Sequence, residues 1–344
     1  MFRFDLRPVL SLRPEGDPGT QIFVFVAFES AGAQFAIVLS GVRCIPLVRF
    51  FTMRLPSTII GLFACLLSMV ACSPQSEQAG ASSVDIWVTL LPQQTIVQAI
   101  AGNYAKVQVM VRPGQSPETY SPSVPQMASL AKADLYFGIG MPLERIIHGK
   151  IERSMPQLRF VQTAELIEAS HDHDHHAACV HGDLDPHVWM DPQWMLGFVD
   201  QVRDALTELE PDSAEVFIAN AEAVSAQLRE LDASLRAQLQ PYAGRSFYIN
   251  HPSLGHFAER YGLAQRSIEQ AGSAPSAKQI AGLMKAAKTE QVGAIFTQPE
   301  FGRSSADVLA RALDVDVVAL DVLSGEYFSN MLDIANRLED SFKR

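Results

Sequence analysis

The chain has 344 residues, of which 48% are hydrophobic and 19% charged, and its formal net charge is −11. This is the composition of a globular protein long enough for two domains. The acidic balance argues against a general nucleic-acid binder, which needs a basic surface. It is compatible with a cation as ligand, although many soluble proteins are acidic.

The N-terminal part predicts export. From Met53 the sequence reads MRLPSTIIGLFACLLSMVAC, one arginine followed by an apolar run and small residues before Cys72. This is the order of an export signal, and the LSMVAC ending is similar to a bacterial lipobox. We therefore interpret residues 53–71 as a lipoprotein signal peptide and Cys72 as the lipidated residue. A membrane-spanning anchor is the alternative, but residues 59–71 are few for a bilayer span.

The segments that flank the signal carry little fold information. Residues 1–52 precede a complete signal and show neither a sustained helical period nor clear strand alternation. We interpret them as an over-extended reading frame; a genuine extra segment is the alternative. Residues 72–83 are small and polar, which predicts a flexible tether. Removal of the leader and acylation of Cys72 leave Cys179 as a single cysteine, so no intramolecular disulfide is expected.

The next part of the chain alternates short apolar runs with amphipathic stretches. Strands are predicted at 84–90, 107–111, 134–140 and 158–162, with helices at 93–102, 123–132 and 141–153. This alternation is typical of a parallel sheet covered by helices. A polar tract, 170–184, interrupts it.

The longest helical signals follow this tract, at 191–211 and 212–240. The second has almost no helix breaker and would span about 40 Å, so we predict that it runs between two lobes. A second series follows, with strands at 245–250, 265–270, 293–297 and 315–320 and helices at 253–261, 276–289, 303–313 and 326–342. The predicted fold class is α/β: two βα lobes, each with a mostly parallel sheet, at 84–210 and 241–344, joined by a long rigid helix at 211–240.

Four turns at the ends of predicted elements carry potential metal ligands. Their residues are Glu118 in PGQSPETY, His187 in DPHVWMDP, His251 in INHPSLGHF and Asp321 in ALDVLSGEYF. Open parallel sheets bind ligands beyond the carboxyl ends of their strands. Two imidazoles and two carboxylates form a complete ligand set for a divalent metal between the lobes. Each residue alone could instead be a helix cap or a hydrogen-bonded core side chain.

These turns also carry a resemblance. PGQSPETY, DPHVW, HPSLGHFAERYGL and LDVL stand in the order of the motifs PGxxPHxY, DPHxW, H-A/P-x-x-x-x-F-x-x-x-Y-G-L and L-D-x-L. The chain from about 84 to 342 resembles the metal-binding lipoproteins of zinc and manganese ABC importers. The resemblance implies two βα lobes, a rigid connecting helix and one metal between the lobes.

The resemblance also implies the ligands. His187, His251 and Asp321 fall on ligand positions of the family, whereas Glu118 stands where the family usually has histidine. We interpret Glu118 as a changed ligand, because the rest of its turn is intact. Two histidines and two carboxylates are a harder set than three histidines and one carboxylate, which leaves Mn²⁺ as an alternative to Zn²⁺.

Histidines and aspartates crowd the polar tract before the DPHVW turn. Its histidines are His171, His173, His175, His176 and His181. Zinc-type members of the resembled family commonly carry such an insertion. We predict a mobile loop that collects Zn²⁺ weakly while the four-ligand site binds it tightly. A solvated linker without any metal role is the alternative.

Five other residues are expected to support or surround the predicted site, or to have no role in it. His256 is expected to pack or face solvent, with a contact to a ligand as the alternative. Glu300 is a candidate for supporting a ligand or joining the lobes, and Cys179 is expected to be incidental. Trp189 and Tyr120 are expected to screen the site from water.

The resemblance implies a function without catalysis. The expected protein is an exported, lipid-anchored, monomeric solute-binding component, periplasmic or on the cell surface. It would capture Zn²⁺ and deliver it to an ABC permease and its ATPase. A manganese or iron receptor of the same class is the alternative. A zinc-dependent hydrolase is a further one, although no HExxH pair is present; a metal-binding adhesin is another.

Overall fold

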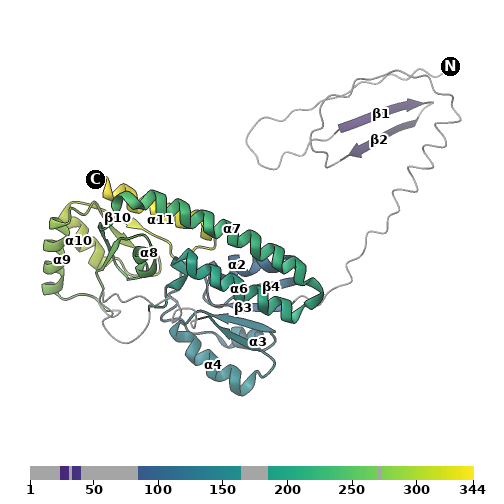
Figure 1. The fold of residues 1–344 in the computed structure, drawn as a ribbon, viewed down its shortest axis with the longest axis horizontal. Helices are drawn as coiled ribbons and strands as arrows, with labels where there is room; N and C mark the ends of the chain where they lie inside the picture. Colours follow the sequence, from purple (N-terminus) through teal and green to yellow (C-terminus); the bar gives the residue numbers. More distant parts are fainter. Residues whose placement is uncertain (1–23, 31–32, 40–83, 164–184, 270–272) are drawn as a thin grey trace. The chain divides into compact units, whose positions relative to one another are not determined.

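The computed structural model describes residues 24–30, 33–39, 84–163, 185–269 and 273–344 (Figure 1). The chain divides into two compact units, Met1–Ser76 and Glu77–Arg344, which are described separately. The interpretations of residues 53–83 and of the histidine tract, including Cys72 and Cys179, lie outside the described residues. In the described part of the chain, no helix is both long and apolar enough to cross a membrane.

The first unit contains an antiparallel pair of strands that the sequence does not predict. Strand β1 (Val24–Ser30) pairs with β2 (Ala33–Leu39). Their sequences, VFVAFES and AQFAIVL, are nearly continuous apolar runs. Alternation of apolar and polar residues is therefore a poor guide to these strands.

The second unit begins with a four-stranded sheet in which all pairs are parallel. The strand order is β4-β3-β5-β6. The bounds are β3 (Val84–Val88), β4 (Ala105–Val109), β5 (Leu135–Gly138) and β6 (Arg159–Gln162). Strand β4 begins two residues earlier than the sequence predicts, because Ala105 already pairs with Val84. This sheet and its helices form the N-terminal lobe.

Helices connect these strands and cover the sheet. They are α2 (Leu91–Ala101), α3 (Val124–Leu130), α4 (Pro142–Ser154) and α6 (Pro192–Leu209). Helix α2 begins directly after β3 because the side chain of Gln93 accepts hydrogen bonds from the backbone N–H groups of Thr89 and Leu90. Those groups would otherwise lack partners at the start of a helix.

Helix α7 (Ala214–Leu239) is the long helix that joins the lobes (Figure 1). Its 26 residues correspond to about 39 Å. Apolar side chains repeat every three or four residues along one face, at Phe217, Ala221, Val224, Leu228, Leu231, Leu235 and Leu239. This face packs against α2 and α6 of the N-terminal lobe and against the C-terminal helix. A single straight element therefore supports both lobes.

The C-terminal lobe repeats the topology of the first. Its parallel sheet has the order β10-β9-β7-β8. In both sheets the first strand in sequence lies between the second and third, although no sequence repeat is present. The elements are β7 (Ser246–Ile249), α8 (Gly255–Arg260), β8 (Ala264–Ser267), α9 (Ala277–Thr289), β9 (Ala294–Thr297), α10 (Ser304–Leu313), β10 (Asp316–Ala319) and α11 (Tyr327–Phe342).

The buried side chains form one large core that runs through both lobes and a smaller one under α9 and α10. Alternation along β7 separates them: Phe247 and Ile249 belong to the large core, and Tyr248 belongs to the small one. Because the large core continues from the N-terminal sheet through α7 to the C-terminal sheet, the lobes share their packing. The sheets therefore meet in a fixed way rather than about a loose linker.

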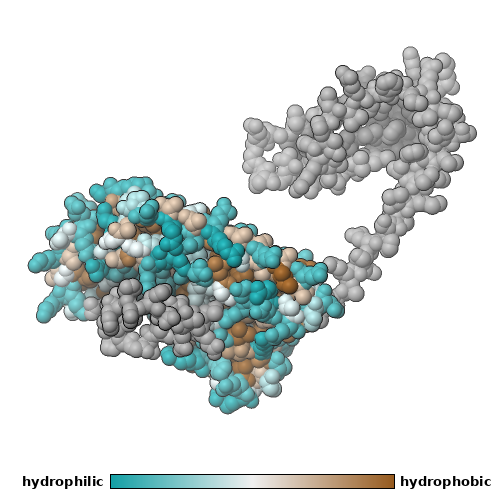
Figure 2. Space-filling view, viewed as in Figure 1, coloured by the Kyte–Doolittle hydropathy of each residue, from teal (hydrophilic) through white to brown (hydrophobic). Residues whose placement is uncertain are grey.

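The surface of this second unit is mostly hydrophilic in the view of Figure 2, with apolar residues in small groups. The most exposed large apolar side chains among the described residues are Val124 and Ile146. Single exposed apolar residues are normal on soluble proteins. They therefore identify no particular interface.

Candidate metal centre

His251 lies just beyond the carboxyl end of β7, one of the two inner strands of the C-terminal sheet. It is 3% exposed, and its ring stacks on that of Phe301 with centroids 4.1 Å apart. Nδ1 lies 3.4 Å from Oε2 of Glu269, whose other oxygen, Oε1, accepts a 2.7 Å hydrogen bond from Asn250. The side chain of Gln298 accepts from the backbone N–H of His251 and donates to its carbonyl. His251 is thus held on both sides of its backbone and by its ring.

His187 begins a short 3-10 helix, Val188–Met190, that leads into α6. It is 5% exposed. Asp185 Oδ1 lies 2.7 Å from Nδ1 of His187 and also accepts a hydrogen bond from its backbone N–H at 3.0 Å. Burial raises the pKa of Asp185, but hydrogen bonding to His187 and the nearby imidazoles outweigh burial and lower it to about 2. Asp185 is therefore an ionised acceptor for Nδ1 of His187. The other nitrogen of the His187 ring, Nε2, then points away from Asp185.

Glu118 comes from the turn that follows β4 in the N-terminal lobe. Gly114 supports this turn with a φ of 77°, a conformation that favours glycine. The Glu118 side chain is 29% exposed, and its Oε1 lies 2.9 Å from Nε2 of His251. Burial raises the pKa of Glu118, but contact with His251 and proximity to His187 give a net lowering. The carboxylate is therefore available as a charged ligand.

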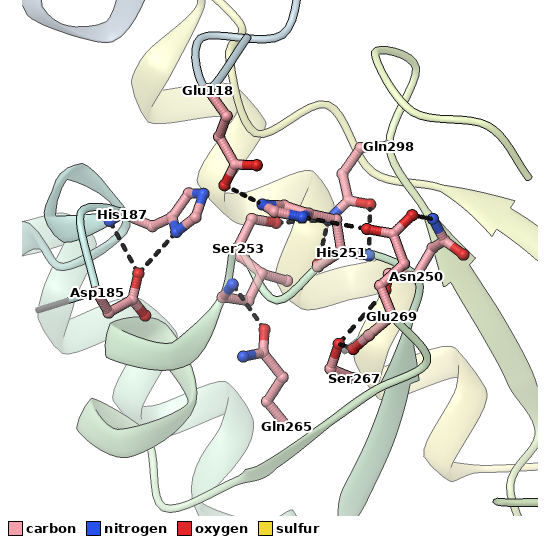
Figure 3. A network of polar contacts seen from close by, with 11 residues as sticks. Glu118, Asp185, His187, Asn250, His251, Ser253, Gln265, Ser267, Glu269 and Gln298 are labelled. Atoms are coloured by element: carbon pink, nitrogen blue, oxygen red, sulfur yellow. Dashed lines mark hydrogen bonds and ion pairs between the residues drawn. The ribbon is translucent and has the colours of Figure 1, made fainter. Parts of the chain in front are cut away.

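These three side chains converge on one point (Figure 3). One ligand atom from each of Glu118, His187 and His251 lies within 4.8 Å of the other two. Zinc binds nitrogen and carboxylate oxygen at about 2 Å, so small shifts of these side chains would bring all three ligand atoms within bonding distance of one ion. Nε2 of His251 is buried and, within the described part of the chain, makes no well-aligned hydrogen bond despite its closeness to Glu118. A metal would use that nitrogen.

Asp321 follows β10, as the sequence predicts, but its side chain is not part of this three-residue group. Oδ1 of Asp321 accepts a hydrogen bond from the backbone N–H of Leu323 at 3.0 Å. Glu300 lies near enough for Asp321 to raise the pKa of Glu300, although burial is the larger cause. Oε2 of Glu300 is buried and has no hydrogen-bond partner among the described residues. The segments after β9 and β10 thus carry one carboxylate each.

Trp189 is fully buried with its ring 5.2 Å from that of His187, and Tyr120 packs partly buried against the large core. His256 does not simply pack or face solvent, because its Nε2 lies 3.0 Å from the backbone carbonyl of Asp185. This contact links His256 to the segment that carries a ligand.

The sequence reasoning missed the two carboxylates behind the histidines, Asp185 and Glu269. An aspartate two residues before His187, able to bond its backbone N–H, is the pattern of an Asx turn and could have indicated the first. Glu269 follows β8 closely, so the rule that polar residues at strand ends line the site could have found the second.

Comparison with known protein families matches residues 86–341 to the family model "ZnuA: Zinc-uptake complex component A periplasmic". The chain belongs to this family. The same family resemblance is carried by the turns around Glu118, His187, His251 and Asp321, so the converging side chains lie within the matched region.

Two curated relatives are named for different metals. The chain is 27% identical over 269 residues to the zinc-binding lipoprotein AdcA of Streptococcus pneumoniae, covering 75% of this chain and 53% of the relative. The chain thus spans about half the length of that relative. It is 25% identical over 260 residues to the manganese-binding lipoprotein MntA of Halalkalibacterium halodurans, covering 73% of this chain and 84% of that protein.

Solved structures share the fold. A crystal structure of ZnuA is 29% identical, with a TM-score of 0.69, and the match covers 75% of this chain and 99% of that one. The periplasmic zinc-binding protein TroA of Treponema pallidum, at 21% identity and a TM-score of 0.68 over 76% of this chain and all of TroA, has the same fold.

Proposed function

We propose that this protein is the extracytoplasmic solute-binding component of an ABC importer and that it captures Zn²⁺. The observation that carries this proposal is the convergence of two buried imidazoles on one carboxylate, with a second carboxylate behind each imidazole. Neutral imidazoles backed by carboxylates are the usual ligands of zinc. Family membership and the zinc-binding AdcA and ZnuA relatives support the same assignment.

Binding would exchange the water shell of the ion for protein ligands. Glu118, His187 and His251 form the group that is already assembled, and we propose Asp321 as the fourth ligand. Asp321 would have to turn away from its contact with Leu323. Glu118 and Asp321 together would neutralise a divalent ion, whereas one carboxylate would leave a net charge.

Release would require a limited movement. The large core runs through both lobes, and α7 supports both. A wide opening would therefore expose packed apolar surface, and this exposure costs a free energy of about 25 cal/mol per Å². A small shift of the Glu118 turn or of the C-terminal loops would instead separate the ligands. The protein would perform no chemistry on its cargo.

The assignment extends to partners and location. We propose delivery to a membrane permease and its ATPase, attachment to a bacterial membrane through lipid on Cys72, a periplasmic or cell-surface location, and a monomeric state. Family membership supports a transport partner and a periplasmic location, and the lipoprotein names of relatives support the lipid anchor.

Metal analysis of the purified protein, expressed without added metal, tests the function. We expect one tightly bound zinc per chain that is retained after dialysis. Weaker zinc would be removed by a mild chelator. A protein that retains no metal and shows no tight zinc site on titration would contradict the proposal.

Manganese is a second candidate because Glu118 adds an oxygen ligand where the family usually has histidine. Hard oxygen ligands favour Mn²⁺, while intrinsic affinity favours zinc at most sites. Competition of equimolar Zn²⁺ and Mn²⁺ for the purified protein distinguishes the two. Retention of manganese in the presence of equimolar zinc would favour the manganese receptor.

A further inference from the structure

The segment that carries His187 is tied to the C-terminal lobe. The indole N–H of Trp189 donates to the carbonyl of Val322 at 2.8 Å. The hydroxyl of Tyr327 donates to the carbonyl of Trp189 at 2.9 Å. These hydrogen bonds hold His187 against the lobe that carries His251, although His187 precedes α6 in the sequence. The two imidazole rings lie 5.3 Å apart.

Asp185 makes the contacts that decide where the His187 ring points (Figure 3). Its Oδ1 faces both Nδ1 and the backbone N–H of His187, and its own carbonyl faces Nε2 of His256. His256 lies on α8, so one short residue joins the His187 ring to the C-terminal lobe. Glu269 holds His251 less closely, at 3.4 Å, and shares its carboxylate with Asn250.

The close approach of Asp185 depends on the absence of a side chain at Gly255. A Cβ added at Gly255 would lie 2.5 Å from Oδ2 of Asp185, a distance at which one of them must move. The backbone at Gly255 is not in the left-handed region, so alanine is strained there only by this contact. The first residue of α8 is thus shaped to admit the Asp185 carboxylate.

We propose that Asp185 is the positioning residue of the metal site and that Gly255 provides the space for it. Asp185 accepts the Nδ1 proton of His187 and fixes the tautomer whose Nε2 lone pair faces Glu118 and His251. Without it the ring could rotate or carry its proton on Nε2, and the ligand would have to reorganise before each binding event. This inference rests on the proposed function, because it assumes that the three-residue group binds the metal.

Two glycine variants test the proposal without removing a polar group. Gly255→Ala displaces Asp185, while Gly282→Ala on α9 adds a methyl where nothing lies within 4 Å. Loss of a partner that orients a ligand typically weakens metal binding roughly 10–100-fold. We expect Gly255→Ala to weaken zinc binding by about this factor and Gly282→Ala to leave it unchanged, as measured by competition with a chromophoric chelator.

A direct substitution series separates positioning from folding. Asp185→Asn retains an oxygen that can accept the His187 proton, so it should bind zinc more tightly than Asp185→Ala. Nitrogen chemical shifts of His187 in the metal-free protein should show the proton on Nδ1 in the parent and a tautomer mixture in Gly255→Ala and Asp185→Ala. The absorption spectrum of the Co²⁺-loaded protein should change in the same variants.

The outcomes are distinct. If the parent binds zinc tightly while Gly255→Ala and Asp185→Ala bind it equally well, with an unchanged His187 tautomer, the positioning role is wrong and the proposed function stands. If the parent itself has no tight zinc site, the positioning role and the proposed function are both wrong.

Discussion

Oε1 of Glu118 lies 2.9 Å from Nε2 of His251, and the two residues come from different lobes. The acid follows β4 of the N-terminal sheet, and the histidine follows β7 of the C-terminal sheet. Their contact places a negative oxygen against a buried nitrogen that makes no well-aligned hydrogen bond among the described residues. A divalent cation between them would satisfy both groups at once.

Glu118→Ala should weaken zinc and manganese binding strongly. The loss should exceed the roughly 10–100-fold typical of removing a residue that only supports a ligand, because Glu118 itself supplies an oxygen. Glu118→His should restore tight binding and shift the preference toward zinc, since imidazole suits zinc better than manganese. Calorimetric titration with each metal measures both effects. Parent-like affinities in Glu118→Ala would exclude Glu118 as a ligand.

Deletion of residues 171–181 should remove weak zinc equivalents and keep one tight site. This segment contains five histidines, and single imidazoles on a loop bind zinc weakly compared with a preformed set. Equilibrium dialysis over a range of zinc concentrations gives the stoichiometry and affinity of each class. Disappearance of the tight site with the tract would show that the tract itself contributes transport ligands.

Cys72→Ala should abolish lipid attachment if the LSMVAC segment is a lipobox. The variant should lose incorporation of labelled fatty acid and move from the membrane to the soluble fraction. A Met1 start-codon mutation is the companion measurement, because it should leave the mature product unchanged if translation begins at Met53. Unaltered fatty-acid labelling of Cys72→Ala would contradict the prediction.

Glu144 should make the stability of the protein depend on pH between about 4.5 and 7. The residue is 3% exposed, and burial raises its pKa from 4.5 to about 7 against hydrogen bonds from Thr89, Ile139 and Gly140. In this range the folded protein holds a proton that the unfolded chain releases, so the free energy of unfolding falls as pH rises. The full effect is about 3 kcal/mol.

Urea unfolding of the metal-free protein at pH 5 and pH 7.5 measures this dependence. Glu144→Gln has no ionisable group there, so its stability should change less over the same range. It should also be less stable than the parent at pH 5, because an amide presents one acceptor to donors that a carboxyl group satisfies with two oxygens. Equal slopes in parent and variant would contradict the assignment.

Arg260→Met should destabilise the protein by about 3 kcal/mol, because it leaves a largely buried carboxylate without its partner. Arg260, on α8, pairs with Asp191 at the start of α6 and lies 3.8 Å from Asp232 of α7. The side chains of Arg260 and Asp191 are 18% and 21% exposed. The pair therefore joins both lobes to the linking helix.

Arg303→Met is the matched control. Arg303 pairs with Asp307 one turn along the chain, and the Arg303 side chain is 62% exposed. Exposed pairs contribute little to stability, so this variant should keep the parent midpoint in urea. A loss for Arg260→Met no larger than the loss for Arg303→Met would show that the inter-lobe pair is unimportant.

The sequence by itself determined the βα rhythm of the second unit. Apolar runs and helical periods are local, and the predicted linking helix differs from α7 by only a few residues at its ends. It also placed Glu118, His187, His251 and Asp321 after strands or before a helix, because polar residues at such turns are visible without knowledge of the fold.

Only the tertiary structure decided how these residues meet. Asp185 and His256 are 71 positions apart, yet their contact fixes the segment of His187. Gly255 lies within the predicted helix 253–261 without any local sign of a role, and the atom that a side chain there would meet is an oxygen 70 positions away. The position of Asp321 after β10 was also predictable. Its side chain, however, accepts a hydrogen bond from Leu323 and does not join the three converging ligand side chains. Local patterns fix where a residue stands on its element, whereas packing between lobes fixes the direction and partners of its side chain.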